Sequence, residues 1–183
     1  MRILGISGSL RRGSHNRRLL RAAGNTLPPG VDLVEWEGLA GLPAFDEDLE
    51  STPPPPVQDF LDLIEEADGI LIATPEYNAS LPGSLKNALD WASRPFATNP
   101  LRGKPVAVVG ASTGMFGAVW AQAELRKVLT TIGARVVDHE LAVSYAHERV
   151  QPDGRLLDAG LRDELASVVA MLVGSIPCVA TTP

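Results

Sequence analysis

The sequence predicts an α/β domain in which a parallel sheet has helices on both faces. Short apolar runs that suit buried strands, such as residues 70–73 and 105–111, alternate with longer stretches whose apolar residues recur every three or four positions. Chains that alternate in this way form parallel sheets with right-handed helical crossovers. The length of 183 residues favours one domain, spanning 1–183, that is long enough to bury a sizeable core.

Five strands and five helices are expected in alternation. Residues 2–7 form the first strand, and the helix after it presents Leu19, Leu20 and Ala23 on one face and ends near Gly24. Residues 31–36 alternate apolar and polar side chains, as a half-buried or edge strand does. The remaining elements are a helix around 60–67, a strand at 70–73, a helix from Pro82 to about Ser93, a strand at 105–111, a helix from Phe116 to Gly133, a strand beginning at 135–138 and a helix around 161–172.

Residues 38–56 form a long irregular segment that closes with four consecutive prolines. Such a segment is either a linker between domains or a surface loop, and the strand patterns on both sides of it, which match one sheet, favour the loop. A five-strand chain also favours the flavodoxin-like order 2-1-3-4-5, a three-layer sandwich, over the six-stranded dinucleotide-binding sheet. In that order the loops after the first and third strands face each other across one crevice.

The composition excludes several classes of protein. A hydrophobic fraction of 45% excludes a disordered chain, and a net charge of -6 argues against a general nucleic-acid binder. No apolar stretch is long enough to span a bilayer, so no membrane partner is expected. Cys178 is the single cysteine, which excludes a dithiol cycle within the chain and a disulfide-stapled secreted fold. The start is rich in arginine, as transit peptides are, but residues 2–7 are needed as a core strand, and the expected location is cytoplasmic.

The loop after the first strand carries groups that bind an anion. Ser9 and Ser14 supply hydroxyls, Asn16 an amide and Arg11 a guanidinium, at the start of a helix whose free N–H groups also attract negative charge. The loop matches neither the GxGxxG fingerprint nor the GxxxxGK[ST] loop, which weighs against ATPases and simple NAD-binding folds. The interpretation that remains is a loop that binds a phosphate monoester without a metal. The alternative is that Ser14 only caps the helix and the arginines are solvated.

Two further polar loops follow the third and fourth strands. The third strand ends at Pro75, and a carboxylate, a phenol and an amide follow it at Glu76, Tyr77 and Asn78, before Pro82 opens a helix. The sequence of strand, polar turn and helix is where α/β proteins place ligands, although an ordinary turn would read the same way. After the fourth strand, small residues allow close approach of a flat or chain-like ligand, and they also make routine turns; they are Ser112, Thr113 and Gly114.

With these loops, the chain resembles the NAD(P)H-dependent FMN reductases, a family that includes azoreductase-, chromate reductase- and quinone reductase-like members. The resemblance spans roughly residues 2–140. The residues that carry it are Gly8, Ser9, Leu10 and Arg11 with Ser14 and Asn16, then Leu42 and Pro43 with Asp46, then residues 74–78 and 86–91. One difference is local, because many relatives have small residues and an arginine where this chain has Met115, Phe116 and Trp120.

The resemblance implies roles for the residues of the three loops. Those expected to hold the FMN phosphate are Ser9, Arg11, Ser14 and Asn16, with His15 among the cofactor-binding residues. Those expected to wrap the isoalloxazine edge are Pro75, Glu76, Tyr77 and Asn78, and those expected near the ribityl chain or the ring are Ser112, Thr113 and Gly114.

The resemblance also implies an enzyme in which NADPH or NADH reduces bound FMN and the electrons pass to quinones, azo dyes, metal oxyanions or free flavin. Because the cofactor carries this chemistry, no obligate acid–base residue is expected, and Glu76 and Tyr77 are expected to orient the flavin. The three histidines lack metal-ligand spacing, so no metal is expected. Expected partners are a small-molecule electron acceptor and further copies of the chain in a homodimer or tetramer. The alternatives are a flavodoxin-like FMN electron carrier without NAD(P)H activity, and a non-flavin binding domain on the same fold.

Overall fold

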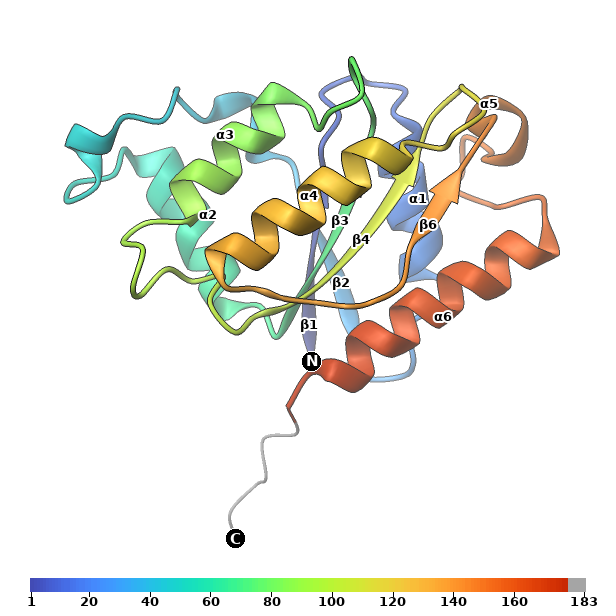
Figure 1. Cartoon of the computed structure of the whole chain (residues 1–183). Coiled ribbons are helices and arrows are strands. Elements are labelled where there is room, and N and C mark those ends of the chain that lie inside the picture. The colour runs from blue at the N-terminus through green and yellow to red at the C-terminus, as the bar shows by residue number, and fades with distance from the viewer. Residues whose placement is uncertain (178–183) are drawn as a thin grey trace, which may run out of the picture.

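The computed structural model describes residues 1–177, and its centre is a six-stranded parallel sheet with helices on both faces (Figure 1). The strands lie in the order β2-β1-β3-β4-β5, and β6 pairs with β4. The predicted flavodoxin-like order is therefore confirmed, with one additional short strand. Cys178 lies outside the described residues.

The strands and helices have the following bounds. The strands are β1 (Arg2–Ser7), β2 (Asp32–Trp36), β3 (Gly69–Thr74), β4 (Pro105–Ala111), β5 (Arg135–Val136) and β6 (Leu141–Val143). The α-helices are α1 (His15–Gly24), α2 (Pro55–Glu66), α3 (Gly83–Ala92), α4 (Val119–Ile132), α5 (Ala146–Arg149) and α6 (Ala159–Ser175), and two short 3-10 helices are Gly38–Gly41 and Glu47–Leu49. No helix within this described part is long and apolar enough to cross a membrane.

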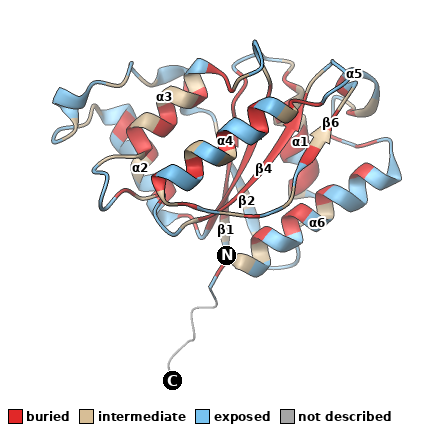
Figure 2. Ribbon diagram, in the orientation of Figure 1, coloured by how far each residue is buried: buried red, intermediate tan, exposed pale blue. Residues whose placement is uncertain are grey.

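Two apolar layers hold the helices on the sheet. Alternate residues of a strand point to opposite faces, so Leu71 packs with α1 and α6 in one layer, whereas Ile70 and Ile72 pack with α2, α3 and α4 in the other. Strands β3 and β4 are buried along their whole length, as expected of central parallel strands. Figure 2 shows buried residues along the sheet and exposed residues on the outer faces of the helices.

One fifth strand was predicted, but two short strands, β5 and β6, take its place beside β4. After α4 the chain pairs with the first residues of β4 through Arg135–Val136, leaves the sheet, and returns to pair with the last residues of β4 through Leu141–Val143. The guanidinium of Arg126 donates hydrogen bonds to the carbonyls of Val137 and His139. These bonds satisfy the backbone that the gap in the strand leaves unpaired.

Two predicted helix starts were also wrong. Helix α4 begins at Val119 and not at Phe116, because Gly117 and Ala118 have φ angles of 61° and 68°, outside the helical region. Helix α2 begins at Pro55, so the last two of the four prolines lie in its first turn, where a missing N–H costs nothing.

The loop before α2 is tied to α3 by two residues that the family resemblance singled out. The amide of Asn87 accepts a hydrogen bond from Phe45 N at 2.7 Å and donates one to Pro43 O at 2.8 Å. The indole N–H of Trp91 donates to the same Pro43 carbonyl at 3.0 Å, and the ring of Phe45 meets Trp91 edge-on. These contacts give Asn87 and Trp91 a structural role.

Candidate functional site

Strands β1, β3 and β4 end at one crevice. Ten of the twelve residues that were predicted to bind the cofactor line this crevice. The lining residues are Ser9, Arg11, Ser14, His15, Asn16, Pro75, Glu76, Tyr77, Ser112 and Thr113, together with Ala111. The two others, Asn78 and Gly114, belong to the same loops without lining the hollow. The enclosed part measures about 120 Å³. The prediction that the loops after the first and third strands face each other across one crevice is thus confirmed, and the loop after the fourth strand lines the same crevice. The role of each residue toward a ligand stays a prediction.

A larger hollow of about 330 Å³ lies beside α2. Its lining carries three carboxylates, those of Glu50, Asp62 and Glu65, against the single guanidinium of Arg94, and this excess of negative charge disfavours the phosphate that the sequence predicts. Within residues 1–177, no three side chains of His, Cys, Asp or Glu gather as a metal site. The crevice at the strand ends is therefore the candidate site.

The β1–α1 loop is held in shape by its own serines. Ser14 caps α1 by accepting a hydrogen bond from Arg17 N at 3.2 Å, and Ser7 and Ser9 accept longer bonds from the N–H groups two residues on. Gly8 lets the loop lie close to α3 and the end of β3, because a Cβ there would sit 2.9 Å from Leu85 Cδ2 and 3.3 Å from Pro75 Cδ. In these contacts the hydroxyls of Ser9 and Ser14 act as acceptors, so both can still donate their protons to an anion.

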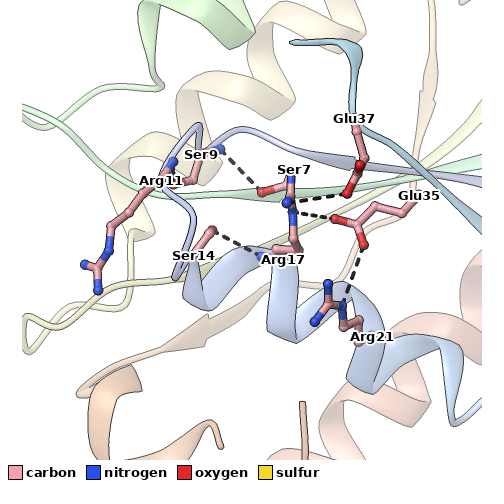
Figure 3. A network of polar contacts seen from close by, with 8 residues as sticks. All are labelled: Ser7, Ser9, Arg11, Ser14, Arg17, Arg21, Glu35 and Glu37. Carbon is pink, nitrogen blue, oxygen red and sulfur yellow. Dashed lines mark hydrogen bonds and ion pairs between the residues drawn. The ribbon is translucent and has the colours of Figure 1, made fainter. Parts of the chain in front are cut away.

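The arginines of this region divide into paired and available ones (Figure 3). Arg17 pairs with Glu35 at 2.7 Å and with Glu37 at 3.4 Å, and Arg21 lies 3.9 Å from Glu35, so β2 and the residue after it neutralise this part of α1. Burial raises the pKa of Glu35 despite both arginines, which lower it. Arg11 extends away from that network and forms no ion pair within the described residues. Sequence reasoning could not make this division, because the Glu35 contacts depend on the pairing of β1 with β2.

His15 begins α1 at the edge of the crevice. Its Nδ1 is buried and has no hydrogen-bond partner among the described residues. Burial, followed by the positive charges of Arg18 and Arg11 and then by His147, lowers the pKa of His15, so the ring is neutral at pH 7. A buried polar atom without a partner costs free energy, which a ligand at this position would recover.

Asn16 joins the first and third loops of the site. Its Nδ2 donates to Ala111 O at 2.9 Å, and its Oδ1 accepts from Ala111 N at 2.9 Å. This pair of bonds extends the end of β4 as a neighbouring strand would. Asn16 was predicted to contact the phosphate; the structure gives its side chain a positioning role, and a direct contact stays a prediction.

The β3–α3 turn is a tight one. Asn78 and Ala79 have φ angles of 54° and 60°, and Tyr77 and Ser80 exchange two backbone hydrogen bonds of 3.0 and 3.2 Å around them. Two left-handed residues between a bonded pair define a type I′ turn. The turn presents Tyr77, which is about half exposed, at the mouth of the crevice.

Glu76 connects this turn to α4. Its Oε2 accepts hydrogen bonds from Trp120 N at 3.0 Å and from Ala121 N at 3.1 Å, the first free N–H groups of that helix. Ala118, the residue at the N-cap, makes no side-chain cap of its own. Glu76 thus supplies the missing cap from another loop. Sequence reasoning missed this contact because Glu76 lies 44 residues before Trp120 and 45 residues before Ala121.

Together, the fold and the crevice define an α/β domain with a helix start free of acidic residues and a tight turn at its topological switch point. A family model described as NADPH-dependent FMN reductase matches residues 1–148. The chain is 44% identical over 165 residues to an NAD(P)H-dependent FMN reductase of Pseudomonas aeruginosa, covering 89% of this chain and 88% of that protein. The chain belongs to the NADPH-dependent FMN reductase family.

Two other comparisons agree with this assignment. A 2-hydroxy-1,4-benzoquinone reductase of a Burkholderia species is 37% identical over 166 residues, with 90% of each chain covered. The solved structure of FerB, a flavoenzyme NAD(P)H:(acceptor) oxidoreductase from Paracoccus denitrificans, superposes with a TM-score of 0.87 at 34% identity and 96% coverage of each chain.

Proposed function

We propose that this protein is an FMN-dependent NAD(P)H oxidoreductase that reduces small-molecule acceptors, with quinones as the leading class and azo dyes, metal oxyanions and free flavin as the others. The observation that carries the proposal is the crevice itself. An acid-free helix start with an available Arg11 lies opposite a rigid turn that presents Tyr77, in a chain of the FMN reductase family.

The donor groups of the crevice fit FMN. The hydroxyls of Ser9 and Ser14, the guanidinium of Arg11 and the N-terminus of α1 would hold a phosphate dianion, and no acidic residue lies in the first turn of that helix. His15 Nδ1 is the unpartnered polar atom at this end. The Pro75–Asn78 backbone and the loop with Ser112, Thr113 and Gly114 would flank the ring and the ribityl chain.

When bound, FMN supplies the chemistry of taking electrons from a nicotinamide and passing them on. The chain's own residues bind and orient. Asn16 fixes the β4 end against α1, and Glu76 fixes the β3–α3 turn against α4. Tyr77, half exposed at the mouth, limits access to the ring.

The alternative is an FMN electron carrier that has no use for a pyridine nucleotide. The names of the relatives favour the enzyme, because both close relatives reported above are described as reductases. The two functions differ in one reaction, the reduction of bound FMN by NAD(P)H.

The test is to load the purified protein with FMN and mix it anaerobically with NADPH or NADH. Loss of the visible flavin absorbance within the turnover time is expected. Bound flavin that neither nucleotide reduces would contradict the enzyme and leave the carrier. Protein that takes up no FMN would contradict the flavin site altogether and favour a non-flavin domain.

A homodimer or tetramer and a cytoplasmic location are also proposed. The first follows from the family resemblance, and the second from the intracellular supply of NAD(P)H that the reaction needs. Light scattering of the purified protein and fractionation of cells test them.

A further inference from the structure

We propose that Phe116 and Trp120, flanked by Met115 and Tyr77, form a stacking wall for the electron acceptor, and that this wall makes planar, uncharged aromatic compounds the preferred oxidants. The proposal rests on the proposed function and assigns the side of the site that faces the second substrate. The cofactor-binding loops leave that side unassigned.

The wall consists of large apolar side chains on the surface. Phe116 is 53% exposed and Trp120 is 48% exposed, and Met115 and Tyr77 are exposed to a similar degree. The rings of Phe116 and Trp120 meet edge-on, with centroids 4.8 Å apart and an angle of 62° between their planes. Aromatic pairs of this geometry attract one another, so the two rings hold one another in place while about half of each residue stays exposed to a further ring.

The wall borders the crevice. Trp120 N donates to Glu76, and Ser80 Oγ donates to Glu124 Oε2 at 2.6 Å, so the first two turns of α4 lie against the turn that presents Tyr77. Trp120 and Glu124 are four residues apart and share one face of the helix. Phe116 follows the crevice residue Thr113 by three positions. A flat molecule entering beside Tyr77 would therefore meet these rings.

The backbone fixes Phe116 in this exposed place. Gly117 lies against β6, and a Cβ on it would stand 2.5 Å from the carbonyl carbon of Ala142. Gly117 and Ala118 are both left-handed, and on the other side of the loop Tyr145 N donates to Gly114 O at 3.1 Å. Because both ends of this loop are fixed, the ring of Phe116 stays exposed to water. This exposure is unfavourable, and a bound ligand that covered the ring would relieve it.

The chemistry of the wall selects the ligand. Residues 105–123 contain no charged side chain and no histidine. Two carboxylates lie beside the wall and both are engaged, since Oε2 of Glu76 accepts from two N–H groups and Oε2 of Glu124 accepts from Ser80 Oγ. A surface of this kind stacks neutral aromatic rings and offers no cation to an oxyanion. In the net reaction, a quinone, NAD(P)H and one proton give the hydroquinone and NAD(P)⁺, so two electrons and two protons reach the acceptor.

The kinetic test uses FMN-loaded protein reduced with dithionite, with the excess removed, so that its outcome does not depend on NAD(P)H activity. Reoxidation by 1,4-naphthoquinone is compared with reoxidation by ferricyanide, which is compact and charged and does not stack. Phe116→Ala and Trp120→Ala should each slow the reaction with naphthoquinone about three- to tenfold. Both variants should react with ferricyanide at the wild-type rate within twofold.

The matched control is Phe96→Ala. Phe96 is as exposed as Phe116, but it adjoins Thr131 and Ile132 at the far end of α4, about 17 Å along the helix from Trp120. This variant should react like wild type with both oxidants. Equal slowing with both oxidants in the wall variants, or no slowing in either, would overturn the proposal.

A binding measurement decides the same question without turnover. Calorimetric titration with 2-naphthol, a neutral planar aromatic, should give a Kd about three- to tenfold weaker in Phe116→Ala and Trp120→Ala than in wild type and Phe96→Ala, with or without FMN. Unchanged Kd values in the wall variants would overturn the proposal. If these variants also lost a dimer in light scattering, the two rings would form an interface between copies in place of an acceptor site. Failure of NAD(P)H to reduce the flavin would count against the proposed function alone.

Discussion

The carboxylate of Glu76 accepts a hydrogen bond of 3.0 Å from the backbone N–H of Trp120, 44 residues further along the chain. This bond and its neighbour to Ala121 cap α4 from the β3–α3 turn. The segment between Pro75 and Asn78 was predicted to contact the flavin, and the structure shows that one of its side chains also connects two of the loops that form the crevice. A positioning role for Glu76 has consequences for both stability and binding.

Replacement of Glu76 with alanine should lower the free energy of unfolding by about 1–2 kcal/mol, the usual cost of a lost helix cap. Glu76→Gln, which keeps an acceptor but loses the charge that favours the helix N-terminus, should cost less. Urea unfolding measures both. An alanine variant as stable as wild type would show that the two hydrogen bonds contribute nothing.

Asn16→Asp should destabilise the protein by about 2 kcal/mol or more. The aspartate cannot donate to Ala111 O, and its charge would face that carbonyl in a buried place. Asn16→Ala should also destabilise, since it leaves both backbone groups of Ala111 without partners. The exposed Asn25 supplies the control, and Asn25→Ala should stay within about 0.5 kcal/mol of wild type by urea unfolding. An Asn16→Ala protein that is equally stable would refute the positioning role.

Gly117→Ala should destabilise the protein by about 1–3 kcal/mol, because the φ angle of 61° disfavours a side chain and the new Cβ would meet the backbone of β6. Gly24→Ala is a suitable control, since no atom lies within 4 Å of a Cβ at that position. Thermal unfolding of both variants makes the comparison. If the two substitutions lower stability equally, Gly117 does not fix the loop before α4 against β6.

His15 should make stability depend on pH. Its pKa is lowered in the folded protein from the usual 6.5, so the unfolded chain binds more protons and stability falls as the pH drops below about 6.5. Glu35 affects stability in the opposite direction. Its pKa is raised in the folded protein from the usual 4.5, so the folded chain binds more protons than the unfolded chain, and stability falls as the pH rises above 4.5. Urea unfolding at pH 7.5 and 5.5 should show a smaller loss in His15→Gln than in wild type. An identical loss in both proteins would exclude His15 as the cause.

Sequence patterns were sufficient to predict the sheet order and the meeting of the loops after the first and third strands. Both depend on local features, since buried β-branched strands such as Gly69–Thr74 and turns such as that at Pro75 are visible in the residues themselves. The split of the last strand was not predictable, because residues 135–138 read as the start of one strand, with no sign of the Arg126 bonds that hold the gap. The late start of α4 was hidden for a similar reason, since the left-handed φ of Ala118 is set by β6 packing against Gly117.

The candidate site shows the same division. The residue types at the site were predictable, but the structural roles of three side chains were not, because each role depends on a partner far away in the sequence. Asn16 bonds Ala111, Glu76 caps α4, and Arg17 is neutralised by Glu35. Each partner lies on another element, so spacing along the chain carries no trace of it. Of the arginines near the loop, the structure leaves Arg11 as the cation at the crevice without an acidic partner among the described residues.

The central claim, a crevice that holds the phosphate of FMN, is tested most directly by the affinity of Arg11→Ala for FMN and for riboflavin. We predict that FMN binds the variant more weakly by about 1.5–3 kcal/mol, the usual contribution of hydrogen bonds to a charged group. Riboflavin, which lacks the phosphate, should bind variant and wild type equally. Arg12→Ala removes the same charge from the neighbouring exposed residue and should change the FMN affinity much less. Equal losses of FMN and riboflavin affinity in Arg11→Ala would contradict the claim.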